Sequence, residues 1–200
     1  MEFIAVAVRE ITSVHEQPVD AGGELIARIA AGDRDALTAL YHRERHPLFA
    51  YLLHLTGDVG IAEEVLQDTF VAVWKSAGSF AGRSGARTWL IGIAHRQAHN
   101  TLRRRSLPRA NVAAAERLPD TRPEPEERVI TAATRAEVVA AMTHLSSDHR
   151  EALVLAFAHD LSYQEMADVL GIPVGTVKSR LHGAKRALKE LLGAQREATE

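Results

Sequence analysis

Residues 161–188, LSYQEMADVLGIPVGTVKSRLHGAKRAL, decide the fold of the second half of the chain, because they read as two short helices joined by a tight turn. Ser162 is a good N-cap, and Glu165 three residues later completes a capping box. Gly171 can end the first helix by adopting positive φ, and Pro173 is tolerated in the first turn of the next. The second helix has one apolar stripe, formed by Val174, Val177, Leu181, Ala184 and Leu188.

The opposite face of the second helix is polar and strongly basic. Its residues are Thr176, Lys178, Ser179, Arg180, His182, Lys185, Arg186 and Lys189. A short helix, a glycine turn and a basic amphipathic helix together predict a helix-turn-helix. Such a second helix can lie in the DNA major groove, with side chains on base edges and cations on phosphates. The alternative is a helical hairpin with a solvated basic face, because helix-turn-helix patterns have many false positives.

The composition suits one or two small helical domains. The chain has 200 residues, of which 46% are hydrophobic and only 5% aromatic, so aliphatic side chains must form the cores. A formal net charge of −2 argues against nucleic-acid binding by itself. However, residues 69–115 contain eight lysines or arginines and no acid. A local basic field, and not the average charge, determines DNA binding.

Nothing in the sequence predicts secretion or membrane insertion. The chain has no cysteine, which excludes a disulfide, a cysteine-based zinc site and a thiol sensor. No apolar run approaches the roughly 20 residues of a membrane span. The first residues, MEFIAVAVRE, open with an acid and lack the basic region of a signal peptide. We therefore expect a cytoplasmic protein.

The sequence predicts an all-α protein of two small helical domains joined by a flexible linker. Prolines and charges mark the linker, which holds four of the chain's seven prolines. The predicted boundaries are a tail at 1–22, a first domain at 23–105, the linker at 106–128, a second domain at 129–193 and a tail at 194–200. We expect the first tail to be disordered, with a strand at residues 3–8 as the alternative.

Helical periodicity divides the first domain into four segments, at 24–31, 33–55, 61–74 and 88–105. A glycine-rich loop at 75–87 separates the last two. Pro47 lies inside the second segment and should either kink that helix or split it in two. In the second domain, helices at 129–145 and 148–159 precede the helix-turn-helix.

The helix-turn-helix resembles region four of bacterial sigma factors of the extracytoplasmic-function (ECF) group of the sigma-70 family. The most specific run is GTVKSRL at 175–181. The resemblance implies that the segment reads the minus-35 promoter element through Thr176, Lys178, Ser179, Arg180, His182, Lys185 and Arg186. Gly183 stands where the family more often has arginine, so we expect a lost phosphate contact and a cost of about 1 kcal/mol in helix stability relative to alanine.

The segment IAEEVLQDTFVAVW at 61–74 reads by itself as an amphipathic helix in a bundle. It resembles the clamp helix of region two in the same family, except that Ile61 replaces an acid. The resemblance implies docking on a coiled coil of the largest RNA polymerase subunit through Ile61, Glu63, Glu64, Gln67, Asp68, Phe70 and Trp74. Acids that face a basic partner helix would mainly steer and orient docking.

Two further segments resemble the parts of region two that hold the minus-10 element. The loop at 79–85 could surround an extruded base, although alone it reads as a simple surface loop. The helix TWLIGIAHRQAHNTLRRR at 88–105 presents arginines suited to phosphates, with Arg96 and Asn100 replacing the family's usual asparagine and aspartate. The resemblance assigns this element to Ser79, Phe80, Arg83, Ser84, Arg87, Trp89, Arg96, Asn100 and Arg103.

Two histidine pairs, His95 with His99 and His42 with His46, are each spaced four apart on one helix face. Such pairs can ligate zinc. Arg96 stands where a zinc protease helix would carry glutamate, and no third ligand is evident in the sequence. We therefore expect solvated or phosphate-facing histidines, no metal and no cofactor.

The resemblance covers about residues 24–192, with both domains in the family's order. It implies a sigma factor without catalysis of its own, whose partners are core RNA polymerase, double-stranded and single-stranded promoter DNA, and an anti-sigma factor. One alternative is a stand-alone helix-turn-helix transcriptional regulator with a helical sensor or dimerisation domain. Another is a metal-dependent helical enzyme that uses the histidine pairs. Neither alternative explains both domains.

Overall fold

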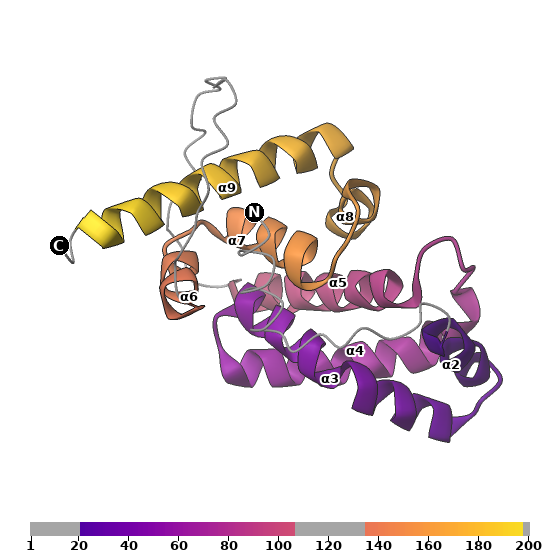
Figure 1. Ribbon diagram of the computed structural model, residues 1–200. Coiled ribbons are helices and arrows are strands. Elements are labelled where there is room, and N and C mark those ends of the chain that lie inside the picture. The colour runs from indigo at the N-terminus through magenta and orange to yellow at the C-terminus, as the bar shows by residue number, and fades with distance from the viewer. Residues whose placement is uncertain (1–20, 107–134, 198–200) are drawn as a thin grey trace.

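The computed structural model describes residues 21–106 and 135–197, in which every regular element is helical (Figure 1). Residues 1–20 of the first predicted tail, the predicted linker from residue 107, the start of the predicted helix at 129–145 and residues 198–200 of the last tail lie outside the described residues. The elements are α2 (Ala21–Ala30), α3 (Arg34–Thr56), α4 (Val59–Ser76), the 3-10 helix η1 (Ala77–Ser79), α5 (Ala86–Ser106), α6 (Arg135–Thr143), α7 (Ser147–Leu153), the π-helical turn η2 (Val154–Ala158), α8 (Tyr163–Leu170) and α9 (Val174–Glu197). The predicted all-α class is confirmed.

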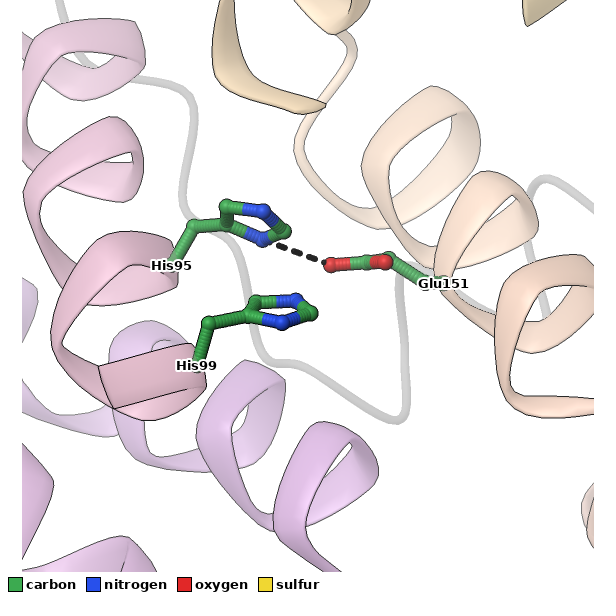
Figure 2. A group of neighbouring side chains, drawn as sticks. All are labelled: His95, His99 and Glu151. Carbon is green, nitrogen blue, oxygen red and sulfur yellow. Dashed lines mark hydrogen bonds and ion pairs between the residues drawn. The ribbon is translucent and has the colours of Figure 1, made fainter. Parts of the chain in front are cut away.

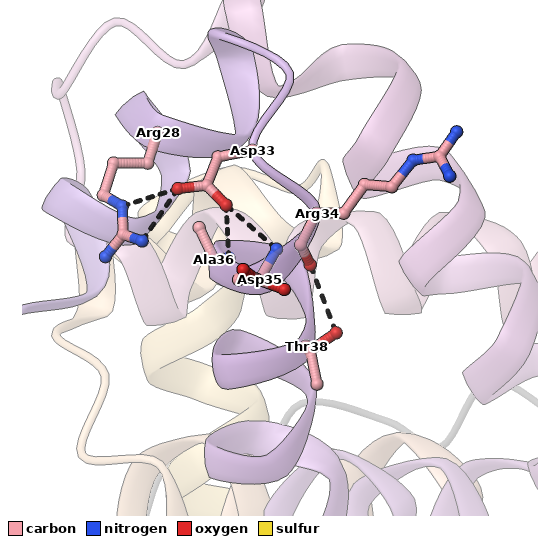
Figure 3. Close-up of polar contacts among 6 residues, drawn as sticks. All are labelled: Arg28, Asp33, Arg34, Asp35, Ala36 and Thr38. Carbon is pink, nitrogen blue, oxygen red and sulfur yellow. Dashed lines mark hydrogen bonds and ion pairs between the residues drawn. The ribbon is translucent and has the colours of Figure 1, made fainter.

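Asp33 organises the corner between α2 and α3. Its side chain caps α3 by accepting hydrogen bonds from the backbone N–H groups of Asp35 and Ala36. Its other carboxylate oxygen accepts two hydrogen bonds from Arg28 on α2, at 2.9 and 2.7 Å (Figure 3). The hydrogen bonds from Ala36 and Arg28 lower the pKa of Asp33, so the cap stays charged at neutral pH.

Helix α3 runs for 23 residues through Pro47, so of the two predicted outcomes, a kink or a split into two helices, the split does not occur. Pro47 removes one backbone hydrogen bond. The ring is itself buried, and the residues that follow it, Leu48, Tyr51 and Leu52, are each no more than 1% exposed. Burial on the core side of the helix therefore offsets the lost hydrogen bond. Gly57, with φ of 68°, then ends the helix in the left-handed conformation.

The core of the first domain lies between α3, α4 and α5, with α2 packed across one end. Its most deeply buried side chains are aliphatic, apart from one tyrosine: Leu40, Tyr51, Leu52, Val65, Val73, Leu90, Ile91 and Ala94. The close approach of α2 to α5 depends on Gly22, because a Cβ atom there would lie 2.7 Å from Cβ of Ala86.

The predicted helix-turn-helix is confirmed. Ser162 and Glu165 form the capping box at the start of α8, and Gly171 ends that helix with φ of 66°. Of the predicted apolar stripe on α9, Val174 is partly buried, and the other four members are at most 3% exposed. The helix continues to Glu197, past the predicted end of the domain at residue 193.

The segment before the helix-turn-helix differs from its prediction. A single helix was expected at 148–159, but α7 ends at Leu153 and the chain continues as a π-helical turn to Ala158. Gly183 of α9 faces α7, where an added Cβ atom would lie 3.1 Å from Nε2 of His149. A side chain at position 183 would therefore require the imidazole of His149 to move by a few tenths of an ångström, a contact that the sequence did not suggest.

The two domains pack directly against each other. Helix α8 lies against α5, and α7 lies against α3, so one continuous hydrophobic core includes residues of both domains (Figure 1). The sequence predicted two modules held only by a linker. Thr88 of α5 donates a hydrogen bond of 2.7 Å to Oε1 of Glu165, whose Oε2 serves the capping box of α8. The same carboxylate therefore starts a helix and joins the domains.

A buried polar cluster of Tyr51, His95 and Glu151 lies within this junction, and Figure 2 shows its His95 and Glu151. Oε1 of Glu151 accepts hydrogen bonds from the Tyr51 hydroxyl at 2.7 Å and from Nδ1 of His95 at 2.9 Å. Burial disfavours ionisation of Glu151, but the His95 and Tyr51 hydrogen bonds outweigh it and lower the pKa of the carboxyl. Burial, and then the charge of Glu151, raise the pKa of Tyr51 well above its usual value, so its hydroxyl remains a donor.

Replacing Tyr51 with phenylalanine tests this junction. Y51F leaves a buried carboxylate with one hydrogen bond fewer, so we expect the free energy of unfolding to fall by about 1–3 kcal/mol. Urea denaturation followed by circular dichroism measures the change. Tyr163 is 43% exposed, so Y163F serves as the control and should change stability by less than about 0.5 kcal/mol. Equal stabilities of Y51F and Y163F would contradict the importance of the cluster.

Candidate nucleic-acid interface

The predicted minus-35 residues follow one face of α9, immediately after the glycine turn. Five of them are exposed: Thr176, Lys178, Ser179, His182 and Arg186. Arg180 and Lys185 are partly buried. Lys178 has its ammonium 5.8 Å from the centre of the Tyr163 ring, and Lys185 lies 5.4 Å from that of Phe157. The face is cationic and accessible, as contact with a duplex requires.

Arg180 is less available than its neighbours on α9. Its guanidinium lies 2.8 Å from Oδ2 of Asp148, at the start of α7. The side chain of Arg180 is 21% exposed, whereas that of Asp148 is 60% exposed. This ion pair fixes the orientation of the arginine, and sequence reasoning did not identify Asp148. A contact of Arg180 with DNA must either share the guanidinium or displace Asp148.

The predicted minus-10 residues separate into an exposed and a partly buried set. Ser79, Arg83, Arg96, Asn100 and Arg103 are exposed, whereas Phe80, Ser84, Arg87 and Trp89 are partly buried. The rings of Phe80 and Trp89 lie 5.4 Å apart, which is a normal separation for an aromatic pair. This pair fixes the loop at 79–85 against the start of α5.

Arg87 and Glu44 form a structural contact inside the first domain. The Glu44 carboxylate is 3% exposed and lies between Nε of Arg43, at 3.0 Å, and Nε of Arg87, at 3.5 Å. The partly buried Arg87 therefore compensates a buried acid. The sequence did not identify the pairing of Glu44 with Arg87, because Arg87 lies on a different helix.

Most predicted polymerase contacts lie along the solvent face of α4. Glu63, Glu64 and Gln67 are exposed, Trp74 is 37% exposed, and Ile61 and Asp68 are partly buried. Glu64 is also ion-paired with Arg105 of α5. Phe70 differs, because it is 7% exposed and packs edge-on against Tyr41 with ring centres 5.0 Å apart.

The exposed face of α4 also includes Val71, which is 51% exposed and was not predicted. Helical spacing contained the signal, since residues 64, 67, 71 and 74 follow one another by three or four. The acidic residues of this face therefore lead into an exposed apolar patch formed by Val71 and Trp74. Exposed apolar side chains of this size suit contact with another protein.

The histidine pairs lie in different environments. His42 and His46 on α3 are exposed, as expected. His95 is only 9% exposed and points across the domain junction to Glu151, so the expectation of a solvated or phosphate-facing histidine is wrong there. His99, one turn further along α5, is exposed, and its ring centre lies 4.2 Å from that of His95.

Comparisons with known proteins match both domains. The family model for sigma-70 region 2 matches residues 40–107, and the model for sigma-70 region 4 matches residues 135–188. The ECF RNA polymerase sigma factor SigK of Mycobacterium sp. (strain KMS) is 35% identical over 173 residues, which are 84% of this chain and 89% of that protein. The RNA polymerase sigma factor YlaC of Bacillus subtilis (strain 168) is 31% identical, over 82% of this chain and 96% of that protein.

Solved structures show the same similarity. The chain matches CnrH, solved in complex with the cytosolic domain of CnrY, with a TM-score of 0.62 and 25% identity, over 88% of this chain and 99% of that chain. It also matches the sigma factor RpoE from Bartonella quintana, solved with the anti-sigma factor NepR. That match has a TM-score of 0.54 and 27% identity, over 73% of this chain and 89% of that chain.

The fold and the basic recognition helix define a two-domain factor of transcription initiation. The chain belongs to the sigma-70 family, and within it to the ECF group. It is a sigma factor that binds core RNA polymerase and directs promoter-specific initiation, with region 4 reading the minus-35 element and region 2 opening and holding the minus-10 element. None of the helices in the described part of the chain combines the length and the hydropathy of a membrane span.

His159 of the second domain is buried at the junction between the two domains. It is 4% exposed, it packs edge-on against Tyr51 of the other domain, and neither of its ring nitrogens has a hydrogen-bond partner. Burial, and then the positive charges of Arg87 and His54, lower the pKa of His159 to about 3. The folded protein therefore requires this histidine to be neutral.

This buried histidine predicts a loss of stability in acid. The unfolded pKa is about 6.5, so the unfolded chain binds the extra proton first. The contribution of His159 is complete above that value and is lost as the pH falls toward 3, by up to about 1.4 kcal/mol per pH unit. H159L should flatten the dependence of unfolding free energy on pH, measured by urea titrations.

The exposed His42 provides a matched control, because it also packs edge-on against a tyrosine, Tyr41. H42L should retain the wild-type dependence on pH. A wild-type slope in H159L would show that His159 is not the group responsible.

Proposed function

We propose that the exposed face of α9 reads the minus-35 element. Lys178 and Ser179, in the first turns of that helix, would contact base edges or nearby phosphates. The other predicted minus-35 residues would bind the DNA phosphate backbone on either side of these contacts: Thr176, Arg180, His182, Lys185 and Arg186. The observation that carries this proposal is the exposed cationic face of α9, which follows the Gly171 turn of the helix-turn-helix.

We also propose that the loop at 79–85 and the exposed face of α5 hold the minus-10 strand. Arg96, Asn100 and Arg103 are exposed on α5 and suit phosphates and base edges. Ser79, Arg83 and Ser84 would line the loop around an extruded base, with the Phe80–Trp89 ring pair as its stacking surface. Arg87 would support the site from within, through its ion pair with Glu44.

Core polymerase would bind the solvent face of α4. In this proposal Glu63, Glu64, Gln67 and Asp68 orient the encounter, whereas Trp74 and Val71 form an apolar anchor. Phe70 and Ile61 would act indirectly, since Phe70 is buried and Ile61 partly buried, and both fix the helix against the core.

Promoter binding requires the two domains to separate. The minus-35 and minus-10 elements lie about 25 base pairs apart, which is about 85 Å of duplex at 3.4 Å per base pair. Domains that share one core cannot reach both elements at once. Residues 107–134 connect them, and at about 3.4 Å per residue this segment can span about 95 Å when fully extended. We infer that polymerase binding stabilises an open arrangement.

The packed arrangement also suits capture by an anti-sigma factor. Two of the solved relatives, CnrH and RpoE, were determined with a bound partner, and RpoE's partner is an anti-sigma factor. An anti-sigma factor that recognised both domains of this chain would keep them together and prevent promoter binding. In this proposal the chain acts in the cytoplasm with polymerase and performs no catalysis itself.

Charge reversal on α9 tests the DNA assignment. K178E should lower run-off transcription by about tenfold on promoters selected from a library, because it replaces an attraction to DNA with a repulsion. R180E should act similarly, but it also breaks the ion pair with Asp148, so K178E is the cleaner variant. Binding to core polymerase, measured by pull-down, should remain unchanged.

Arg34, exposed at the start of α3, offers the control, and R34E should transcribe as the wild type does (Figure 3). Normal transcription by K178E would refute the assignment of α9.

A change on α4 tests the polymerase surface. V71D should weaken core polymerase binding by about tenfold, since it places a charge in the proposed apolar anchor. Titration of labelled protein with core enzyme measures the affinity. Val59, at the start of α4, is 55% exposed, so V59D introduces the same charge at similar exposure and should bind normally. If V71D and V59D bind equally well, the proposed surface is wrong.

A further inference from the structure

We propose that His95, His99 and Glu151 form a binding site for a divalent transition-metal ion, of the zinc class, that bridges the two domains. The two histidines lie four residues apart on α5 of the first domain. Glu151 belongs to α7 of the second domain. The sequence offered no third ligand for this histidine pair, and the packing of the domains supplies one.

The geometry is close to that of a coordination sphere. One potential ligand atom from each of the three residues lies within 4.8 Å of the other two (Figure 2). In a tetrahedral zinc site, bonds of about 2.0–2.1 Å place ligand atoms about 3.4 Å apart. Nδ1 of His95 and Oε1 of Glu151 are already 2.9 Å apart. His99 is exposed, so its side chain is not held within the core.

The donor types suit this class of ion. Two imidazoles and one carboxylate are ligands that zinc accepts, with a fourth position left to water. His95 and Glu151 are 9% and 7% exposed, so an ion between them would be partly shielded from water. The Tyr51 hydroxyl donates to Glu151 at 2.7 Å, which orients the carboxylate as outer-shell hydrogen bonds do in metal sites.

The hydrogen bond between His95 and Glu151 alone does not account for His99. His99 takes no part in the hydrogen bonds of Tyr51, His95 and Glu151. Its ring centre nevertheless lies 4.2 Å from that of His95, and its potential ligand atom lies within 4.8 Å of those of His95 and Glu151. Without a metal, His99 should therefore be replaceable at no cost to the junction. With a metal, it should be required for binding, which makes it the residue to change.

An ion at this site would favour the packed arrangement, because its ligands come from both domains and separate when the domains open. This regulatory consequence rests on the proposed opening during promoter binding. Metal binding itself does not depend on that opening, so an experiment can contradict the metal site and the regulatory consequence separately.

The experiment uses the full-length chain without an affinity tag, titrated with zinc sulfate in competition with a chromophoric chelator. We expect one zinc ion per chain, and affinity at least about tenfold lower in H99A. E151Q keeps the size of the side chain but removes its charge, and should also weaken binding. The double variant H42A/H46A removes the other spaced pair of histidines and should bind zinc as the wild type does.

Zinc should also raise the thermal midpoint of unfolding of the wild type but not of H99A. The absence of stoichiometric binding, or unchanged affinity in H99A, would overturn the site. Loss of binding in H99A with normal binding in E151Q would confine the metal to α5 and overturn the bridge. Transcription assays test the regulatory consequence. It is supported if the metal-free protein supports transcription and zinc inhibits the wild type but not H99A. It is overturned if zinc inhibits H99A as strongly as the wild type.

Discussion

The buried carboxylate of Glu151 holds the junction between the two domains of this sigma factor. It is 7% exposed, and its Oε1 atom accepts hydrogen bonds from Tyr51 and His95, both in the first domain. A buried charge is tolerated only when it is well paired, so the position of α7 depends on these two donors. The apolar core that runs through both domains and the contact between Thr88 and Glu165 reinforce the same arrangement.

This dependence has a direct bearing on transcription initiation. A factor that reads two separated promoter elements must separate its two domains at this junction. Separation exposes Glu151 to water, which then solvates the carboxylate in place of its two hydrogen-bond donors. Polymerase, through α4, and DNA, through α9, can supply the binding free energy that shifts the equilibrium. The Arg180–Asp148 ion pair lies within the second domain, so the recognition helix keeps this support after opening.

Local sequence patterns predicted the elements well. The capping box of Ser162 and Glu165 and the Gly171 turn are confirmed, since each depends on residues three or four apart. Long-range partners could not be predicted in this way: Tyr51 and Glu151 are 100 residues apart, and neither has a distinctive neighbour. For Pro47, local rules left a kink and a split open, and burial in the core favours the continuous helix. The π-helical turn after Leu153 has no period that sequence reasoning recognises.

The measurement that tests this account most directly is the distance between the domains. The chain lacks cysteine, so single cysteines at exposed Arg34 and Lys189 can carry a fluorophore pair without other changes. The account predicts one compact distance distribution for the free chain. It predicts an increase of several tens of ångströms when core polymerase and promoter DNA are both bound. An unchanged distance in the promoter complex, or an extended free chain, would contradict the account.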